Sequence, residues 1–252
     1  MKKLVLISCL TALTAFSNLS MAQESKTDKI FRTFRFGLFL GPTINSLKPT
    51  AASADHYVVT KGKGHLGFSF GINADYNANE RYTIYTGVGI DWRGGSIDVA
   101  YDTTLQQQPP ATYLLDANVT YKKMQYLAIP IGLKMKAFDF DKFKVFAQTG
   151  FDFDILLSQK GDYTMRLTKD SVVKKSNEKL GAVAKVVPIN IGWCIGAGVE
   201  YTFNEKNAFY GAILYRNGFV DATTPQTNDK GWRYADGNIR SNSVLIRVGY
   251  FF

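Results

Sequence analysis

The sequence predicts an all-β protein, an eight-stranded antiparallel up-and-down transmembrane β-barrel. Three observations support this prediction: eight segments in which apolar and polar residues alternate, connections that are short and long in turn, and a last strand that ends the chain on Phe252. Successive side chains of a strand point to opposite faces. Such alternation therefore gives an apolar face for lipid and a polar face for the interior of a barrel.

The N-terminus is typical of a secretory signal peptide. Two lysines precede a short apolar region at residues 4–16, and the small residues Ser20 and Ala22 flank one free position. We therefore expect cleavage after Ala22, which removes residues 1–22 as a signal peptide. Residues 23–252 then form a single outer-membrane β-barrel domain.

Charge and cysteine content narrow the class of protein. The formal charge is +9, and loss of the signal peptide with its two lysines leaves +7. Cys9 leaves with that peptide, unless it takes a lipid as in a lipoprotein, and Cys194 then has no partner for an internal disulfide. No later stretch reaches the roughly 18 unbroken apolar residues of a membrane helix. This leaves a soluble exported protein or a β-barrel, and the alternation favours the barrel.

Each expected strand has an apolar face at every second position. In chain order, the strands and their main outward residues are 34–41 with Phe36 and Leu38, 66–76 with Phe68 and Phe70, 82–93 with Ile84 and Val88, 127–136 with Ile129 and Ile131, 145–155 with Phe151 and Phe153, 189–203 with Ile191 and Trp193, 209–219, and 243–252 with Ile246 and Val248. The polar face of the sixth strand is largely glycine, which suits a narrow interior. The phase of the seventh stays open, because residues 210–214 are apolar on both faces.

The connections set the topology. Residues 77–80, 138–143 and 204–207 are short connections, whereas residues 43–64, 94–123, 158–187 and 220–241 are long and polar. Membrane barrels have short periplasmic turns and long external loops. We therefore expect both termini in the periplasm and four loops outside the cell.

One segment resembles a known family closely. Tyr126–Lys136 reads YLAIPIGLKMK and is similar to the Tyr-Leu-x-Ile-Pro-Leu strand of the porin-like outer-membrane β-barrel family of Bacteroidetes-type, Gram-negative bacteria that includes PorT. The glycine-rich strand 192–201 and the stretch 214–219 agree with it. The resemblance covers about residues 30–252. It implies an eight-stranded outer-membrane barrel, and for the PorT branch a role in type IX protein secretion.

The inward positions carry charges of both signs in near balance. They are Arg35, Asp75, Asp91, Arg93, Lys134, Lys136, Asp152, Asp154, Glu200, Arg216 and Arg247. Unpaired buried charges cost several kcal/mol, so we interpret this set as a salt-bridge plug that closes the barrel. A narrow path for ions or protons along Asp152, Asp154, Lys134 and Arg247 is the alternative. Pro130, in mid-strand, removes a ladder hydrogen bond and predicts a bulge.

Catalysis has little support in the sequence, and we expect no enzyme, cofactor or metal site. The chain has 2 histidines, His56 and His65. Asp55 and His56, with Ser53 nearby, form the one arrangement that could act on lipid or peptide at the rim, and we interpret it as a solvated loop. Metal-ligand clusters, phosphate-binding glycine loops and nucleophile motifs are absent from the sequence.

The expected partners lie at the surface. Basic residues of the third long loop, among them Lys169, Lys174, Lys175 and Lys179, suit the phosphates of lipopolysaccharide. Tyr250 and Phe252 form an expected insertion signal for the barrel assembly machinery. Nothing suggests nucleic-acid binding, and we expect a monomer that acts structurally or binds a protein through its external loops. A narrow small-solute porin and a type IX secretion component are the alternatives.

Overall fold

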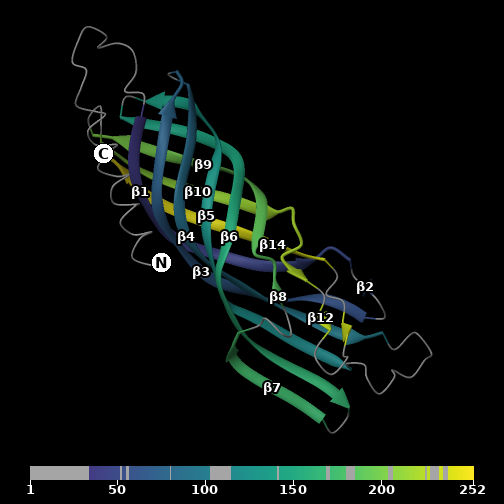
Figure 1. Ribbon diagram of the computed structural model, residues 1–252. Coiled ribbons are helices and arrows are strands. Elements are labelled where there is room, and N and C mark those ends of the chain that lie inside the picture. The colour runs from purple at the N-terminus through teal and green to yellow at the C-terminus, as the bar shows by residue number, and fades with distance from the viewer. Residues whose placement is uncertain are drawn as a thin grey trace. The chain divides into compact units, whose positions relative to one another are not determined.

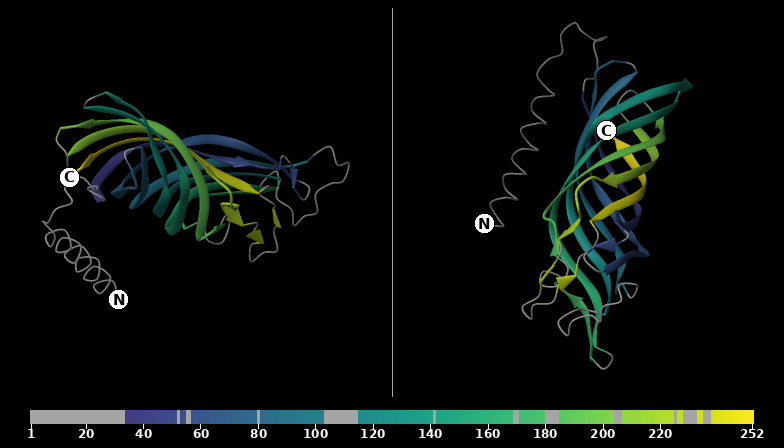
Figure 2. Two further views of the ribbon diagram at one scale, coloured as in Figure 1. Left: turned by 90° about the horizontal axis from the view of Figure 1, so that it is seen from above. Right: turned by 90° about the vertical axis from the view of Figure 1, so that its right-hand side faces the viewer.

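In a computed structural model, eight long antiparallel strands form a closed ring (Figures 1 and 2). The ring runs β1, β3, β4, β5, β6, β9, β10, β14, and β14 pairs back to β1. The ring strands are β1 (Phe34–Pro49), β3 (Tyr57–Asn77), β4 (Tyr82–Tyr101), β5 (Asp116–Phe140), β6 (Phe143–Thr168), β9 (Ile189–Thr202), β10 (Ala208–Gly218) and β14 (Ile239–Phe251). The predicted fold class is confirmed.

Six shorter strands lie in the long connections. They are β2 (Ser53–Ala54), β7 (Ser171–Glu178), β8 (Lys185–Val186), β11 (Thr223–Thr224), β12 (Gln226–Thr227) and β13 (Arg233–Tyr234). The structure describes residues 34–51, 53–54, 57–79, 81–102, 115–140, 142–168, 171–179, 185–203, 207–224, 226–227, 233–234 and 238–252. The expected signal peptide, Asp55, His56 and Lys169 lie outside these residues. No helix of the described part has the length and apolar character needed to cross a membrane.

The two faces of the ring differ as the alternation predicts. On β14, Val244, Ile246 and Val248 are exposed, whereas Leu245 and Arg247 between them are buried. The outward apolar residues of all eight strands form an apolar belt, which includes Phe36, Leu38, Leu66, Phe68, Phe70, Ile84, Val88, Leu127, Ile131, Leu133, Phe151, Phe153, Ile155, Leu157, Ile189, Ile195, Phe209, Ile213, Ile246 and Val248. Such a belt is what a barrel presents to hydrocarbon.

Burial settles the phase of β10. Phe209, Ile213 and Tyr215 are exposed, and Tyr210 and Leu214 are buried. Both faces are apolar here because the inward side chains pack against other apolar groups of the interior, so hydropathy alone could not tell the two faces apart.

Five strands, β1, β3, β4, β5 and β6, continue beyond the apolar belt, which corrects the expectation of long loops at 43–64, 94–123 and 158–187. In this extension the alternation reverses its sense. On β4, Ile97 and Val99 are buried and Asp98 between them is exposed. On β5, Val119 is buried and Asn118 is exposed. Outside lipid the outward face must be polar and the inward face can be apolar, so these strand segments lack the outward apolar residues that mark the membrane-spanning ones.

The reversed segments enclose an apolar core of their own. Its buried members include Leu47, Tyr57, Val59, Ile97, Val99, Val119, Tyr121, Met124, Tyr126 and Ile239. β7 pairs with the end of β6 in a hairpin, and all its residues are exposed. Figure 1 shows this hairpin projecting from the end of the sheet.

Pro130 does not mark a bulge, so that prediction is wrong. Pro130 stands opposite Asp152 of β6 in an unbroken register. On the β4 side the register is the same at Ile131 and Ala128, on either side of the proline. The backbone N–H that Pro130 lacks would lie in a short gap of the hydrogen-bond ladder between β4 and β5. In this gap Thr86 Oγ1 donates to the Pro130 carbonyl at 2.9 Å.

Candidate functional site in the barrel interior

Five charged residues form one buried network, here called the Arg93 cluster: Asp91, Arg93, Asp152, Asp154 and Arg216. Arg93 donates through Nη1 and Nη2 to the two carboxylate oxygens of Asp154, both at 2.7 Å, and Nη2 also donates to Asp91 at 2.9 Å. Arg216 donates from Nη1 to Asp91 at 2.6 Å and from Nε to Asp152 at 2.7 Å. Three carboxylates and two guanidinium groups give this cluster a net charge of −1.

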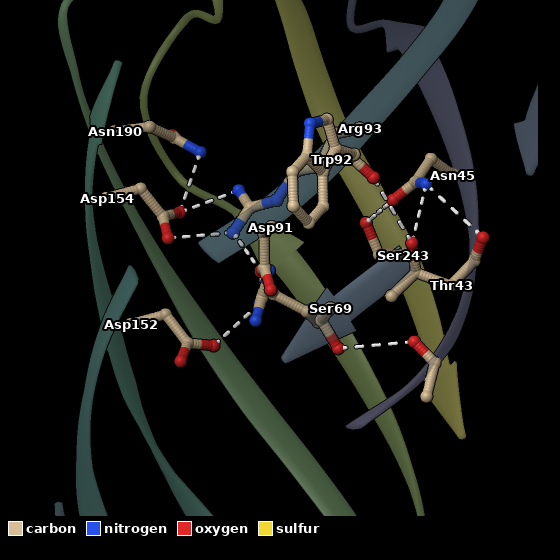
Figure 3. A network of polar contacts seen from close by, with 12 residues as sticks. Thr43, Asn45, Ser69, Asp91, Trp92, Arg93, Asp152, Asp154, Asn190 and Ser243 are labelled. Atoms are coloured by element: carbon tan, nitrogen blue, oxygen red, sulfur yellow. Dashed lines mark hydrogen bonds and ion pairs between the residues drawn. The ribbon is translucent and has the colours of Figure 1, made fainter. Parts of the chain in front are cut away.

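A neutral network lies beside it on β1 and β14. Ser243 Oγ donates to Asn45 Oδ1 at 2.6 Å, and Asn45 Nδ2 donates to Thr43 Oγ1 at 2.9 Å. Figure 3 shows Asp152 and Asp154 on one side of the interior, the neutral residues on the other, and Asp91 between them. The polar interior is therefore bridged from wall to wall.

Four charged residues form a second network, here called the Arg35 cluster: Arg35, Asp75, Lys134 and Glu200. Arg35 makes a two-pronged ion pair with Glu200, at 2.5 and 3.0 Å. Lys134 Nζ lies 2.6 Å from Asp75 Oδ2, and Arg35 Nη2 lies 3.4 Å from the same oxygen. Two cations and two carboxylates make this cluster neutral.

Aromatic rings lie under the buried cations. The Phe251 ring lies 4.5 Å from Arg35 Cζ and 5.1 Å from Lys134 Nζ. The Tyr126 ring lies 4.8 Å from Arg93 Cζ. In a site from which water is excluded, an aromatic face stabilises a cation. Tyr126 and Phe251 stand at inward positions of the alternation, which is the one sign of these rings in the sequence. The cations that they contact come from other strands, so the contacts themselves could not be predicted.

Arg247 completes the charge balance. Its Cζ lies 4.4 Å from the centre of the Phe39 ring, and the ten buried charged residues of the described chain comprise five cations and five carboxylates. Arg247 lines a cavity of about 20 Å³, together with Asn73, Tyr85 and Gln148. A cavity of this size holds about one water molecule. The polar interior is thus filled by side chains, and the apolar core of the extension fills the barrel beyond it.

Glycine on the inner wall makes room for one large side chain. Gly132 and Gly150 stand opposite each other on β5 and β6. A methyl group on Gly150 would lie 2.6 Å from Tyr85 Oη and 2.7 Å from Gly132 Cα. Tyr85 Oη also lies 3.4 Å from the buried Cys194 Sγ. The missing side chains therefore allow the Tyr85 side chain to lie along the inner wall, over β5 and β6 toward Cys194 of β9.

Comparison with known proteins shows the family to which this barrel belongs. A family model described as "Outer membrane protein beta-barrel domain" matches residues 21–224. The chain belongs to this family. As an outer-membrane β-barrel it is an integral protein of that membrane. The match is to the general barrel domain, so the PorT-like branch stays a prediction.

Solved structures resemble this outer-membrane barrel at low identity. Ail, the attachment invasion locus protein of Yersinia pestis, is 10% identical with a TM-score of 0.35, over 86% of this chain and 98% of its own. OprG of Pseudomonas aeruginosa is 14% identical with a TM-score of 0.41, over 86% and 95%. The outer-membrane protease OmpT of Escherichia coli is 8% identical with a TM-score of 0.48, over 92% and 99%. No curated protein matches the chain.

The structure places the predicted inward charges of this outer-membrane barrel together. Ten of the eleven are buried, and Lys136 is half-buried with Nζ 3.4 Å from Asn77 Oδ1. Lys174 and Lys175 lie exposed on β7, and Lys179 follows it. Within the described residues, no group of three or more His, Cys, Asp and Glu side chains is placed to hold a metal ion.

The C-terminal aromatics occupy two different positions. Phe252 is exposed, and Tyr250 packs on Phe209 with ring centroids 5.0 Å apart. Phe251 between them is fully buried. The two residues of the expected insertion signal therefore belong to the outer surface, and their neighbour belongs to the interior.

Proposed function

We propose that this outer-membrane barrel is closed and acts through the part of its sheet that extends beyond the apolar belt. The filled interior carries this proposal. Both charge clusters span the polar lumen, the cavity between them measures about 20 Å³, and an apolar core occupies the extension. A solute would have to separate buried ion pairs to pass, and breaking such a pair costs about 3–5 kcal/mol.

We place both termini in the periplasm and the extension outside the cell. The short connections lie at one end of the ring and the long ones at the other, as in barrels with periplasmic turns. The extension has a polar outer surface and an apolar inside, the distribution of a water-exposed domain. Tyr250 and Phe252, on the outer surface of the last strand, are then available to the assembly machinery during insertion.

The surface proposed to bind a partner includes the β6–β7 hairpin. The hairpin carries Lys174, Lys175 and Arg166, all exposed. Among the described residues β7 pairs with β6 alone, and its other edge suits an extended segment of another protein, because unpaired strand edges accept added strands. The partner is then a protein with negative charge at that segment.

Conductance of the refolded chain 23–252 tests the closed barrel. We expect a gel shift on boiling, which shows a folded barrel, and no current steps in planar bilayers. Steady, salt-dependent steps would contradict the proposal and support a narrow porin, with Asp152, Asp154 and Lys134 as the lining to mutate. Loss of secreted proteins in a deletion strain, restored by the gene, would instead support the type IX role that the resemblance implies.

A further inference from the structure

A bulge in β5 turns two consecutive lysines to the outer surface. Tyr121 and Met124 are both fully buried and point inward. The register against β6 shifts between Tyr121 and Lys123, so β5 has one extra residue here. Lys122 and Lys123 are therefore both exposed. Bulges re-aim side chains in this way.

The two lysines have different surroundings. Lys122 Nζ forms an ion pair with Asp162. Lys123 stands directly opposite Lys160 of β6, which is half-exposed. Like charges that face each other across two strands destabilise a sheet. Among the described residues, no carboxylate lies within ion-pair distance of Lys123 or Lys160, and the nearby Asp162 is already bound by Lys122, Ser176 Oγ and the Asn177 N–H.

The short strand β8 lies next to this pair. The Val186 N–H of β8 donates to Gln159 Oε1 at 2.9 Å, which holds β8 against β6 beside Lys160. Lys185 of β8 is exposed. β8 therefore lies beside β6 at the level of the Lys123–Lys160 pair.

That level lies just above the apolar belt. Leu127 and Ile155 form the last paired apolar row, Gln125 and Ser158 form a polar row above it, and Lys123 and Lys160 form the next. Four residues beyond Leu127 correspond to about 14 Å along the strand, or about 10 Å in height at a tilt of about 45°. Lipid headgroups occupy about 5–8 Å outside the hydrocarbon, and a lysine stem can lean several ångströms toward them.

We propose that Lys123 and Lys160 bind a phosphate group of the outer-leaflet lipid, the lipid A part of lipopolysaccharide. A phosphate with about two negative charges neutralises both ammonium groups and removes their repulsion. Lys174 and Lys175, the lysines expected from the sequence to make this contact, stand opposite Thr164 and Tyr163, three to four residues farther from the belt than Lys160. This site rests on the proposed placement of the extension outside the cell, and it is independent of whether the interior conducts.

The test uses the refolded mature chain in phosphatidylcholine bilayers of three kinds: with lipid A, with lipid A whose phosphates have been removed, and with free inorganic phosphate only. The readout is the affinity for lipid A, together with the urea midpoint for loss of the gel shift. The variant is Lys123→Gln/Lys160→Gln, and the matched control is Lys174→Gln/Lys175→Gln. We expect phosphorylated lipid A alone to raise the midpoint of the wild type, and the first variant to bind it about tenfold more weakly than the control.

A second result follows without lipid A. In plain phosphatidylcholine the Lys123→Gln/Lys160→Gln variant should have a higher urea midpoint than the wild type, because the repulsion is gone, and this also shows that it folds. Equal loss of affinity in both variants, or an equal gain from dephosphorylated lipid A, would overturn the proposal. A gain from inorganic phosphate alone would overturn its assignment to lipid.

Discussion

Arg93 and Asp154 form a two-pronged ion pair from β4 to β6, past the intervening strand β5. Each terminal guanidinium nitrogen lies 2.7 Å from one carboxylate oxygen, and both side chains are almost completely buried. A planar guanidinium matches a carboxylate in this arrangement better than a lysine could. The pair therefore fixes the distance between two walls of the barrel.

Loss of one partner should destabilise the barrel strongly. Asp154→Asn leaves the buried Arg93 with Asp91 as its remaining carboxylate, and we expect a loss of about 3–5 kcal/mol in the free energy of unfolding. Urea titration of the gel shift in detergent measures it. The control is Asp116→Asn, which breaks the exposed pair with Arg166 (2.9 Å) and should cost less than about 1 kcal/mol. Equal costs would show that the interior pair contributes no more than a surface pair.

Substitutions of the last two residues should affect stability and insertion differently. Phe251→Ala removes the ring under Arg35 and Lys134, and we expect a loss of about 3–5 kcal/mol in refolded protein. Phe252→Ala changes an exposed ring and should leave that stability nearly unchanged, while lowering the amount of barrel assembled in cells. Normal assembly of Phe252→Ala in cells would contradict its role in the insertion signal.

Gly150→Ala should disturb the inner wall although it adds one methyl group. The methyl would meet Ile131 O at 2.4 Å and Tyr85 Oη at 2.6 Å. Since the backbone atom cannot move aside, we expect a loss of about 1–3 kcal/mol. Gly211→Ala is the matched control, because a methyl at Gly211 meets no atom within 4 Å. A Gly150→Ala barrel as stable as the control would show that the Tyr85 side chain can adopt another position.

Acid should loosen the β6–β7 hairpin. Hydrogen bonds from Lys122, the Asn177 N–H and Ser176 lower the pKa of Asp162 from its usual 3.8 to about 2. Because the folded pKa is depressed, this stabilisation is fully present above about pH 4 and is lost as pH falls through about 2. Amide exchange at Asn177 should therefore accelerate below pH 3 relative to neighbouring amides, after correction for intrinsic rates. An Asp162→Asn variant with the same pH dependence as the wild type would contradict this assignment.

Alternation of residue type was sufficient to predict the membrane-spanning strands. It placed Arg93, Asp154 and Arg216 inside because period two is the same in sequence and in a strand. It could not give the partners, since Arg35 and Glu200 are 165 residues apart and meet only when the ring closes. The extension was missed because outside lipid the sense of the alternation reverses. The Lys123–Lys160 pair depends on a bulge, which shifts register without a signal in composition.

The placement of the charges also constrains the order in which the barrel can form. β4 to β6 carry Asp91, Asp152 and Asp154 but, of the Arg93 cluster, only one cation, and the second, Arg216, arrives on β10. A half-assembled sheet of β4 to β6 would leave Asp152 without Arg216, the residue with which it forms its ion pair. The ion pairs of Arg216 with Asp91 and Asp152 thus form only when β10 docks, which makes closure of the barrel cooperative.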